Sequence, residues 1–295
     1  MTVKASLNAP LLLEPTQVDY VLLDSGHGRK LERLGGVVSN RPEPQAVWAP
    51  KLPESEWKKA VAVFAPKAND EDGDSGNWEV AKGVPDAWDV SYGKLIFKGR
   101  LTPFRHLGCF PDQSPQWAWL EQTIKPGMKV LNLFGYTGVA SMVAAAAGAE
   151  VTHVDASKKA IGYGRENLEL NGMKDAKIRW MLDDCFAFVA REVRRGNSYD
   201  IIIMDPPKYG RGPDGERWDF FGGMPEFLEN IAKLTKPQGH VWLTAYALRV
   251  SSVALGTMLA ETMPKGTTEI GEFVSVDNFG RRFTNSMWAR WNGRA

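Results

Sequence analysis

Hydrophobic residues form continuous runs in the second part of the chain, and these runs alternate with longer segments of helical periodicity. Continuous apolar runs are typical of strands in a parallel sheet, because helices cover both faces of such a sheet. The predicted strands are 129–134, 150–155, 177–182, 199–205, 240–246, 268–276 and 281–291. Their alternation with helices predicts an α/β fold with a doubly wound, seven-stranded, mostly parallel sheet.

The helices and the last turn add detail to this topology. A helix is expected over 158–170, since the pair Asn171-Gly172 that follows it is a favourable C-terminal cap. Further helices are expected up to Gly148, up to Arg194, near 224–235 and near 252–263. The final two strands are joined by the turn 278–280, which is short enough to allow only an antiparallel pair. We therefore expect an antiparallel strand at the edge of the sheet.

The first 105 residues follow a different pattern. Prolines and turn residues separate short strand-like runs such as 61–64 and 94–99, and one helix is expected near 54–60. Short strands with frequent turns indicate a small α+β module. The sequence therefore predicts an N-terminal α+β domain over 1–105, which we expect to recognise the substrate, and a second domain over 106–295.

Composition and charge exclude several classes of protein. The chain of 295 residues is 43% hydrophobic and 24% charged, as in ordinary folded proteins. Lys and Arg number 36 against 35 acids, so a uniformly basic nucleic-acid surface is excluded, although a local basic patch is not. The two cysteines are too few for a disulfide framework, and the four histidines are scattered, so we expect no metal. We see no secretion signal and no apolar run of about 20 residues, so we expect a cytoplasmic protein without a membrane partner.

The ends of the predicted strands carry candidate binding residues. In an open α/β sheet the ligand binds at the carboxyl ends of the strands, near the point where strand order reverses. The first strand runs into the segment 132–138, where Gly135 and Gly138 permit a tight turn close to a ligand. The second strand ends at Asp155, twenty residues after Gly135, where a carboxylate can accept hydrogen bonds from ribose hydroxyls. The third ends at 183–185, where a carboxylate and a backbone amide are available to an adenine ring.

The turn itself separates the classes of nucleoside cofactor. A dinucleotide site usually contains G-x-G-x-x-G, which cradles a pyrophosphate. Here Leu133 or Phe134 replaces the first glycine, and no G-K-[ST] follows, so a P-loop is excluded. A methionine-derived cofactor carries no phosphate and tolerates this turn. The sequence therefore favours S-adenosyl-L-methionine (SAM), with a nicotinamide-dependent oxidoreductase as the alternative.

The fourth strand ends in the segment 205–209, Asp-Pro-Pro-Lys-Tyr. Its two prolines remove two backbone donors and fix the chain direction, which leaves carbonyls and the Asp205 carboxylate for a planar, hydrogen-bond-donating substrate such as a nucleobase amine. Tyr209 offers an aromatic face, and Lys208 is suited to contact a phosphate or to orient Asp205. We expect the following loop, 208–220, to be a mobile substrate flap. The alternative is a loop that merely ends a strand.

The motifs NLFGYTG, VDAS, DDCF and DPPKY occur in this order, preceded by HLGCFPDQ at 106–113. Together they resemble the class I SAM-dependent methyltransferases, most closely the branch that contains the large-subunit ribosomal RNA cytosine-C5 and guanine-N7 methyltransferases. The resemblance covers about residues 105–295. It implies a Rossmann-like methyltransferase fold, SAM as cofactor and RNA, with ribosomal RNA favoured, as partner.

The resemblance also implies roles for particular residues. The methionine end of the cofactor is implied to lie on the turn 134–138, the ribose at Asp155, and the methyl-transfer site beside Asp205. The expected cofactor-binding residues are Gln113, Asn132, Phe134, Gly135, Tyr136, Thr137, Gly138, Asp155, Ala156, Ser157, Asp184 and Cys185. The expected catalytic residues are Asp205, Pro206, Pro207, Lys208 and Tyr209.

The chain departs from the family pattern in two ways, and the first limits the reaction. Cytosine-C5 transfer requires a thiolate that attacks C6 of the base. The C5 members that the chain resembles carry this cysteine after the fifth strand, where the segment 243–252 has none. Cys185 lies beside two acids that would raise its pKa, and Cys109 precedes the first strand. We therefore expect methylation of a nitrogen of an RNA base; the alternatives are a protein or small-molecule acceptor, or a non-catalytic RNA-binding protein that keeps the fold.

The second departure is the N-terminal part, which does not resemble the family's RNA-binding domain. It contains a group of basic residues with a tryptophan nearby, and two interpretations of this group stay open. It is either a phosphate-binding and base-stacking surface or a set of solvated charges beside a core tryptophan. The residues concerned are Arg29, Lys30, Arg33, Arg41 and Trp48.

Overall fold

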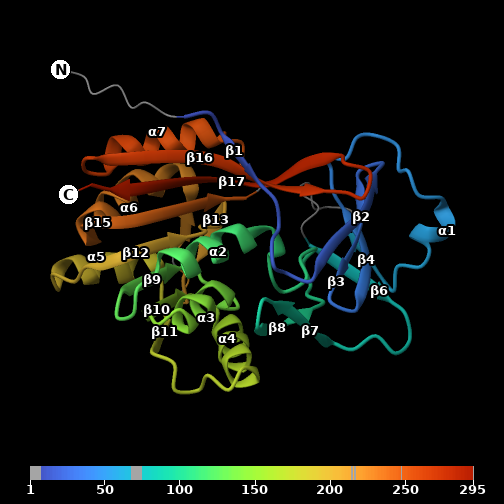
Figure 1. Ribbon diagram of the computed structural model, residues 1–295, viewed down its shortest axis with the longest axis horizontal. Helices are drawn as coiled ribbons and strands as arrows, with labels where there is room; N and C mark the ends of the chain where they lie inside the picture. Colours follow the sequence, from blue (N-terminus) through green and yellow to red (C-terminus); the bar gives the residue numbers. More distant parts are fainter. Residues whose placement is uncertain (1–7, 68–74, 214, 216, 247, 295) are drawn as a thin grey trace. The chain divides into compact units, whose positions relative to one another are not determined.

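The computed structural model describes residues 8–67, 75–213, 215, 217–246 and 248–294 (Figure 1). The chain divides into two compact units. The first contains the described residues of Met1–Leu13 together with Gln116–Phe273 and Asn285–Ala295, and the second contains Glu14–Pro115 and Val274–Thr284. The predicted functional division at residues 105 and 106 stays a prediction.

An eight-stranded, mostly parallel sheet forms the centre of the first unit. Its strand order is β1-β16-β17-β15-β12-β9-β10-β11. The bounds are β1 Leu11–Leu13, β9 Lys129–Leu133, β10 Glu150–Asp155, β11 Ile178–Leu182, β12 Tyr199–Met204, β15 Thr235–Ala245, β16 Gly266–Val276 and β17 Arg282–Gly293. All seven predicted strands are present. The eighth, β1, pairs in parallel with β16 and was not predicted.

The position of the antiparallel strand corrects one expectation. β17 runs antiparallel to β15, as the short preceding turn requires. However, β17 lies between β15 and β16, and the strands at the edges are β1 and β11. The prediction of an antiparallel edge strand was therefore wrong, because the short turn fixes the direction of the final strand but not the side on which it pairs.

The described helices of the first unit were all predicted except α2, which precedes the first predicted strand. Their bounds are α2 Ser114–Thr123, α3 Val139–Ala146, α4 Lys158–Leu170, α5 Cys185–Arg194, α6 Phe220–Leu234 and α7 Ser252–Thr262. α2 begins in the second unit and ends in the first. α6 starts four residues earlier than expected because Asp219 caps it, accepting a 2.8 Å hydrogen bond from the Gly222 N–H. Among the described residues, we find no helix with the length and apolar character needed to span a membrane.

The core of the first unit lies between the central strands and their helices. β12 is buried along nearly its whole length, and Ile201 and Ile202 have no exposed surface. Helices α5 and α6 contribute Phe188, Phe227 and Ile231 to the same cluster. Burial on both sides explains why these strands are continuous apolar runs in the sequence, and it holds the strand ends in fixed positions.

The second unit is a small module of short strands and one short helix, which agrees with the predicted α+β pattern. A five-stranded sheet has the order β2-β3-β4-β5-β6, and β7 and β8 form a separate pair. The bounds are β2 Tyr20–Gly26, β3 Arg29–Leu34, β4 Val37–Pro42, β5 Ala62–Pro66, β6 Gly76–Val80, β7 Ala87–Tyr92, β8 Leu95–Arg100, α1 Glu54–Trp57 and the 3-10 helix η1 Pro111–Gln113. The turn between β16 and β17 completes this unit, because Arg281 pairs with Asp24 and Ser25 donates a 2.7 Å hydrogen bond to Asp277.

The basic residues of this unit are held by partners within it. Lys30 is 5% exposed and forms an ion pair of 3.0 Å with Glu43. The indole N–H of Trp48 donates a 3.0 Å hydrogen bond to the Ser25 carbonyl. The other pairs are Arg29 with Asn40, Arg33 with Asp19 and Arg41 with Glu32. These contacts favour structural charges around a packed tryptophan over a phosphate-binding surface.

Candidate cofactor and acceptor site

Four parallel strands end side by side in the first unit. β12, β9, β10 and β11 are consecutive neighbours, with Met204 opposite Leu133, Leu133 opposite Val154, and Asp155 opposite Leu182. From β9 the chain continues to β10 and β11 on one side and then returns to β12 and β15 on the other. β9 therefore adjoins the point where strand order reverses, which is where open α/β sheets bind their ligands.

The turn between β9 and α3 has an unusual backbone. Phe134, Tyr136 and Gly138 all have positive φ angles, of 56°, 49° and 72°. For a residue with a side chain this left-handed conformation costs about 1–3 kcal/mol and persists only where the surroundings hold it. The Gly135 N–H donates to the Val154 carbonyl (3.1 Å), and the Gly138 N–H donates to the Gly135 carbonyl (3.0 Å). The turn is thus tied both to itself and to β10.

Asp155, at the end of β10, holds this turn through its side chain. Oδ2 accepts a 2.8 Å hydrogen bond from the Tyr136 N–H, and Oδ1 accepts one of 2.8 Å from the Ser157 N–H. Burial raises the pKa of the Asp155 carboxyl above its usual value, while these two N–H groups act in the lowering direction. The carboxylate is therefore fixed in place, and each oxygen keeps a lone pair for a further donor.

The turn between β9 and α3 packs on the side chains of His153 and Trp180. His153 is fully buried and its ring contacts that of Trp180, with centroids 4.5 Å apart. A Cβ added at Gly135 would lie 2.6 Å from His153 Nδ1, and one added at Gly138 would lie 2.8 Å from the Trp180 ring. Both distances are too short for real contacts. Both glycines are therefore required for close approach, and Gly138 is also required for the turn because its φ is positive.

Asn132 belongs to the same group of packed side chains. It is 5% exposed, and its side-chain nitrogen donates a 2.8 Å hydrogen bond to Ser141 Oγ. The same oxygen lies 2.9 Å from His153 Nδ1. The structure therefore places Asn132 beneath the turn, where it supports the turn through Ser141 and His153. Sequence reasoning missed this chain of contacts, because its members lie on β9, α3 and β10.

The end of β11 joins the same site. The Asp183 N–H donates to the Asp155 carbonyl (3.2 Å), which ties the second and third strand ends together. Asp184 caps α5 by accepting a 2.8 Å hydrogen bond from the Ala187 N–H. Cys185 is buried, and its Sγ accepts a hydrogen bond from the Phe134 N–H at 3.3 Å. Burial, supported by the nearby carboxylates, raises the pKa of the Cys185 thiol well above its usual value, so this thiol is neutral.

The end of β12 brings the predicted catalytic segment next to the turn. The Asp205 N–H donates to the Leu133 carbonyl at 3.4 Å, one residue before Phe134. Pro206 is buried, whereas Pro207 and Tyr209 are exposed. Lys208 Nζ lies 5.4 Å from the centre of the Tyr209 ring. The acid–diproline corner and the glycine turn therefore occupy adjacent positions at one edge of the sheet.

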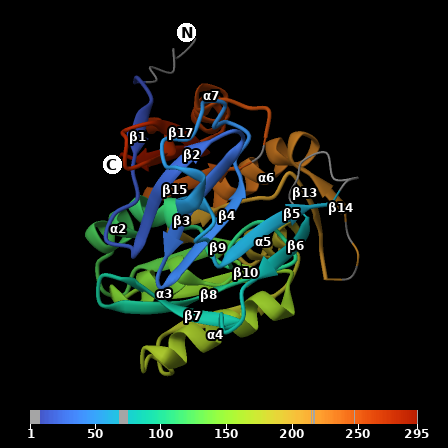
Figure 2. The same cartoon turned by 90° about the vertical axis from the view of Figure 1, so that its right-hand side faces the viewer.

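The expected flap is a β-hairpin. β13 (Tyr209–Arg211) pairs antiparallel with β14 (Arg217–Asp219), and the Phe220 N–H closes the base by donating to the Lys208 carbonyl at 3.1 Å. Residues 214 and 216 of the predicted flap lie outside the described residues. The hairpin begins at the predicted catalytic segment and leads directly into α6 (Figure 2). Its mobility stays a prediction.

The remaining predicted residues lie on several elements. Thr137 and Gly138 lie in the turn, and Ala156 and Ser157 follow Asp155 on the way into α4. Ser157 caps α4 with a 3.2 Å hydrogen bond from the Ala160 N–H. Gln113 lies in η1 of the second unit. In the described part of the chain, no group of three or more His, Cys, Asp and Glu side chains is arranged to hold a metal ion.

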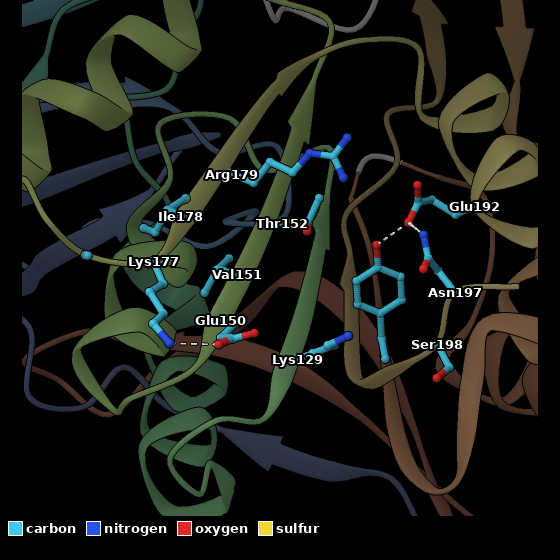
Figure 3. A pocket seen from close by; sticks show the side chains of 12 residues that line it. Lys129, Glu150, Val151, Thr152, Lys177, Ile178, Arg179, Glu192, Asn197 and Ser198 are labelled. Atoms are coloured by element: carbon cyan, nitrogen blue, oxygen red, sulfur yellow. Dashed lines mark hydrogen bonds and ion pairs between the residues drawn. The ribbon is translucent and has the colours of Figure 1, made fainter. Parts of the chain in front are cut away.

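A separate hollow of about 530 Å³ lies at the opposite, amino ends of the same strands (Figure 3). Several of its polar side chains are paired with one another. Glu192 accepts hydrogen bonds from the Tyr199 hydroxyl (2.7 Å) and the Asn197 amide (2.8 Å), and Lys177 pairs with Glu150 at 2.8 Å. We assign no function to this hollow.

The fold and the turn define the class of protein. A doubly wound sheet whose first strand ends in a glycine turn, with an acid at the end of the second strand, is the arrangement of Rossmann-like proteins that bind a nucleoside-containing cofactor. Residues 67–238, more than half of the chain, match the family of S-adenosylmethionine-dependent methyltransferases. The chain belongs to this family.

The chain is also similar to individual proteins of known structure or sequence. The chain is 42% identical to a SAM-dependent methyltransferase of known structure from Agrobacterium tumefaciens, with a TM-score of 0.92, over 98% of this chain and 96% of that one. SMU.776, solved in complex with S-adenosylhomocysteine (SAH), shares the fold, with a TM-score of 0.73 at 17% identity over 93% of this chain and 76% of that one. The ribosomal RNA large subunit methyltransferase K/L of Shewanella frigidimarina is 35% identical over 147 residues, which are 49% of this chain and 20% of that protein. The chain thus spans about a fifth of the length of this curated relative.

These comparisons confirm the predicted family, the Rossmann-like methyltransferase fold and SAM as the cofactor. They set aside the nicotinamide-dependent alternative. The geometry fits SAM, since the Asp155 carboxylate keeps a lone pair on each oxygen beside the turn, and the two glycines let the turn lie close against His153 and Trp180.

Proposed function

We propose that this protein transfers a methyl group from SAM to a nitrogen atom of a base in RNA, with ribosomal RNA as the favoured substrate. The observation that carries the proposal is the hydrogen bond from the Asp205 N–H to the Leu133 carbonyl, because it sets the acid–diproline corner beside the cofactor turn. The name of the Shewanella relative supports RNA as the substrate class. Action on ribosomal RNA implies a cytoplasmic setting.

The strand ends hold the cofactor in this proposal. Asp155 accepts hydrogen bonds from the ribose hydroxyls through the lone pairs that Tyr136 and Ser157 leave open. The backbone of residues 134–138 faces the methionine end. Asp184 caps α5 through Oδ1, and we assign its Oδ2 to the adenine amino group, beside Ala156 and Cys185. Gln113 stays a predicted contact from the sequence.

The acceptor is held at the end of β12. SAM supplies a methyl group on a sulfonium, which is already activated for displacement. The Asp205 carboxylate and the carbonyls next to it accept a hydrogen bond from the attacking nitrogen and stabilise the positive charge that grows on it. Pro206 and Pro207 keep the backbone direction fixed. Holding the nitrogen in line with the methyl group supplies about 7–11 kcal/mol of the barrier.

The state of the two cysteines supports nitrogen as the acceptor atom. Cys109 and Cys185 are both buried, and burial raises the pKa of both thiols. A neutral, buried thiol cannot attack C6 of a cytosine, as C5 methylation requires. Nitrogen methylation needs no such nucleophile from the protein.

The test compares nucleosides from ribosomal and transfer RNA of cells with and without the protein, by mass spectrometry. We expect one N-methylated nucleoside to be missing without the protein and to return with the wild-type chain. Asp205→Asn should not restore it, although this variant should bind SAH normally. The matched control is Asp200→Asn, at the opposite end of β12, which should restore the nucleoside. An unchanged nucleoside profile would reject RNA in favour of a protein or small-molecule acceptor.

A further inference from the structure

Trp218 links the two halves of the candidate site. It lies on β14, opposite Gly210 of β13, two residues before the start of α6. A Cβ added at Gly210 would lie 2.5 Å from Trp218 Nε1 and 3.4 Å from Pro207 Cγ. The indole therefore packs directly on the backbone that follows the acid–diproline corner.

The same ring reaches the cofactor turn. Trp218 stacks on Phe134, with centroids 5.7 Å apart and an interplanar angle of 24°. Phe186 at the start of α5 contacts Trp218 at 4.7 Å, and Phe227 of α6 lies 4.3 Å from Phe186. These rings come from separate elements, and they form a wall between the turn and the corner. A planar base that receives a methyl group must enter beside this wall.

The indole N–H of Trp218 makes no hydrogen bond within the described part of the fold. Its ring is half-buried, while Nε1 is closed off from solvent and has no hydrogen-bond partner among the residues that the structure describes. Buried N–H groups are normally satisfied, and an orphaned one costs stability. Trp78, Trp88 and Trp57 each donate the indole N–H to an oxygen at 2.8 to 3.0 Å. Among the described residues, Trp242 and Trp288 share the orphaned N–H of Trp218, but their rings are fully buried in the core, whereas the ring of Trp218 is half-buried.

We propose that Trp218 recognises the target base: its ring forms one wall of the acceptor pocket, and a rotation of the half-buried indole brings its N–H, which is closed off in the unbound protein, to a carbonyl oxygen or unprotonated ring nitrogen of the base. This inference rests on the proposed function, since it requires a nucleobase as acceptor. It gives the hairpin a role in substrate selection. Asp205 positions the attacking nitrogen, and Trp218 checks a neighbouring acceptor atom on the same ring.

The test distinguishes the contribution of the aromatic ring of Trp218 from that of its N–H group. The probe is ribosomal RNA isolated from cells that lack the protein. Trp218→Phe keeps an aromatic wall and should raise KM for this RNA by about 3- to 10-fold, which corresponds to one neutral hydrogen bond. Trp218→Ala also removes the stacking surface and should reduce kcat/KM by about 10- to 100-fold. Trp218→Phe keeps the ring that stacks on Phe134 and should bind SAH with nearly the wild-type Kd in calorimetry. Phe221→Ala, which removes an exposed ring from α6, is the control and should leave KM unchanged.

A second readout does not depend on turnover. With SAH present, adding this RNA should change the fluorescence of the wild-type protein more than that of Trp218→Phe, and the difference reports the indole at position 218. A wild-type KM and an equal fluorescence change in Trp218→Phe would overturn the inference while leaving RNA methylation intact. Failure of the wild-type protein to methylate the RNA would instead overturn the proposed function, and this inference with it.

Discussion

The backbone N–H of Tyr136 donates a 2.8 Å hydrogen bond to Oδ2 of Asp155, so the acid that ends the second strand holds the turn that follows the first. Tyr136 has a φ of 49°, a conformation that needs such support. The carboxylate therefore fixes the turn, and we propose that its remaining lone pairs bind the cofactor. Loss of the carboxylate should affect both.

Asp155→Asn is expected to weaken SAH binding. The amide replaces one acceptor oxygen by a donor, which faces either the Tyr136 or the Ser157 N–H and removes a charge-assisted hydrogen bond worth about 1.5–3 kcal/mol. Titration calorimetry should show a Kd about 10- to 100-fold higher than that of the wild-type chain. Asp175→Asn, on an exposed loop, serves as the control. Equal affinities for the Asp155 variant and the wild type would remove Asp155 from the site.

Gly135→Ala is expected to destabilise the fold at the turn. The new methyl would collide with His153, which is fully buried and packed against Trp180. Overpacking of this kind costs about 1–3 kcal/mol, which chemical denaturation would detect. Gly162→Ala is the matched control, because its methyl would point into open space within α4 and should be neutral or slightly stabilising. A loss of the same size in both variants would contradict the close approach of turn and histidine.

Methylation is expected to continue without either thiol. Cys185→Ser keeps an acceptor for the Phe134 N–H, and Cys109→Ser makes a similarly small change at the other buried cysteine. The double variant should retain most of its turnover, since in the proposed mechanism neither thiol takes part in methyl transfer and the hydroxyl of Cys185→Ser still accepts the Phe134 N–H. Initial rates with labelled SAM provide the measurement. A loss of several orders of magnitude in either single variant, with SAH binding intact, would indicate a cysteine nucleophile.

Acid is expected to destabilise the first unit through His153. Burial lowers the pKa of this imidazole to about 3, whereas an unfolded histidine has a pKa of about 6.5. The unfolded chain therefore takes up the proton first, and the free energy of unfolding falls as the pH drops from about 6.5 towards 3, by up to about 1.4 kcal/mol per pH unit. His153→Gln should show a shallower pH dependence in urea denaturation. His27→Gln, at an exposed position, should match the wild type.

His106, whose pKa burial lowers to about 4, adds a parallel loss of stability in the second unit. The His153 variant should therefore keep part of the pH dependence. Identical slopes for the wild type and His153→Gln would show that His153 does not carry the effect.

Local patterns explain what could be predicted from the sequence. The core strand β12 is a nearly continuous apolar run, and Asp155 was found by its distance from Gly135 along the chain. Both signals are short-range, so they can be recognised in the sequence without the tertiary structure. The resemblance then gave the family and the cofactor.

Features that depend on distant partners could not be predicted. β1 is only three leucines long, and it becomes a strand through pairing with β16, more than 250 residues away. The insertion of β17 between β15 and β16 has no local signal either. Trp218 was visible in the sequence as part of a loop, but its stacking on Phe134 joins two segments 84 residues apart. The stacking of Trp218 on Phe134, on which the proposed base recognition rests, could therefore not be predicted from sequence spacing.

The most direct test of the account is a calorimetric titration of the wild-type protein with SAH. The strand ends around Asp155 should bind about one molecule per chain with a Kd in the micromolar range, equivalent to about −7 to −8 kcal/mol. Absence of heat with about 1 mM SAH or SAM would contradict the assignment of the cofactor site to these strand ends.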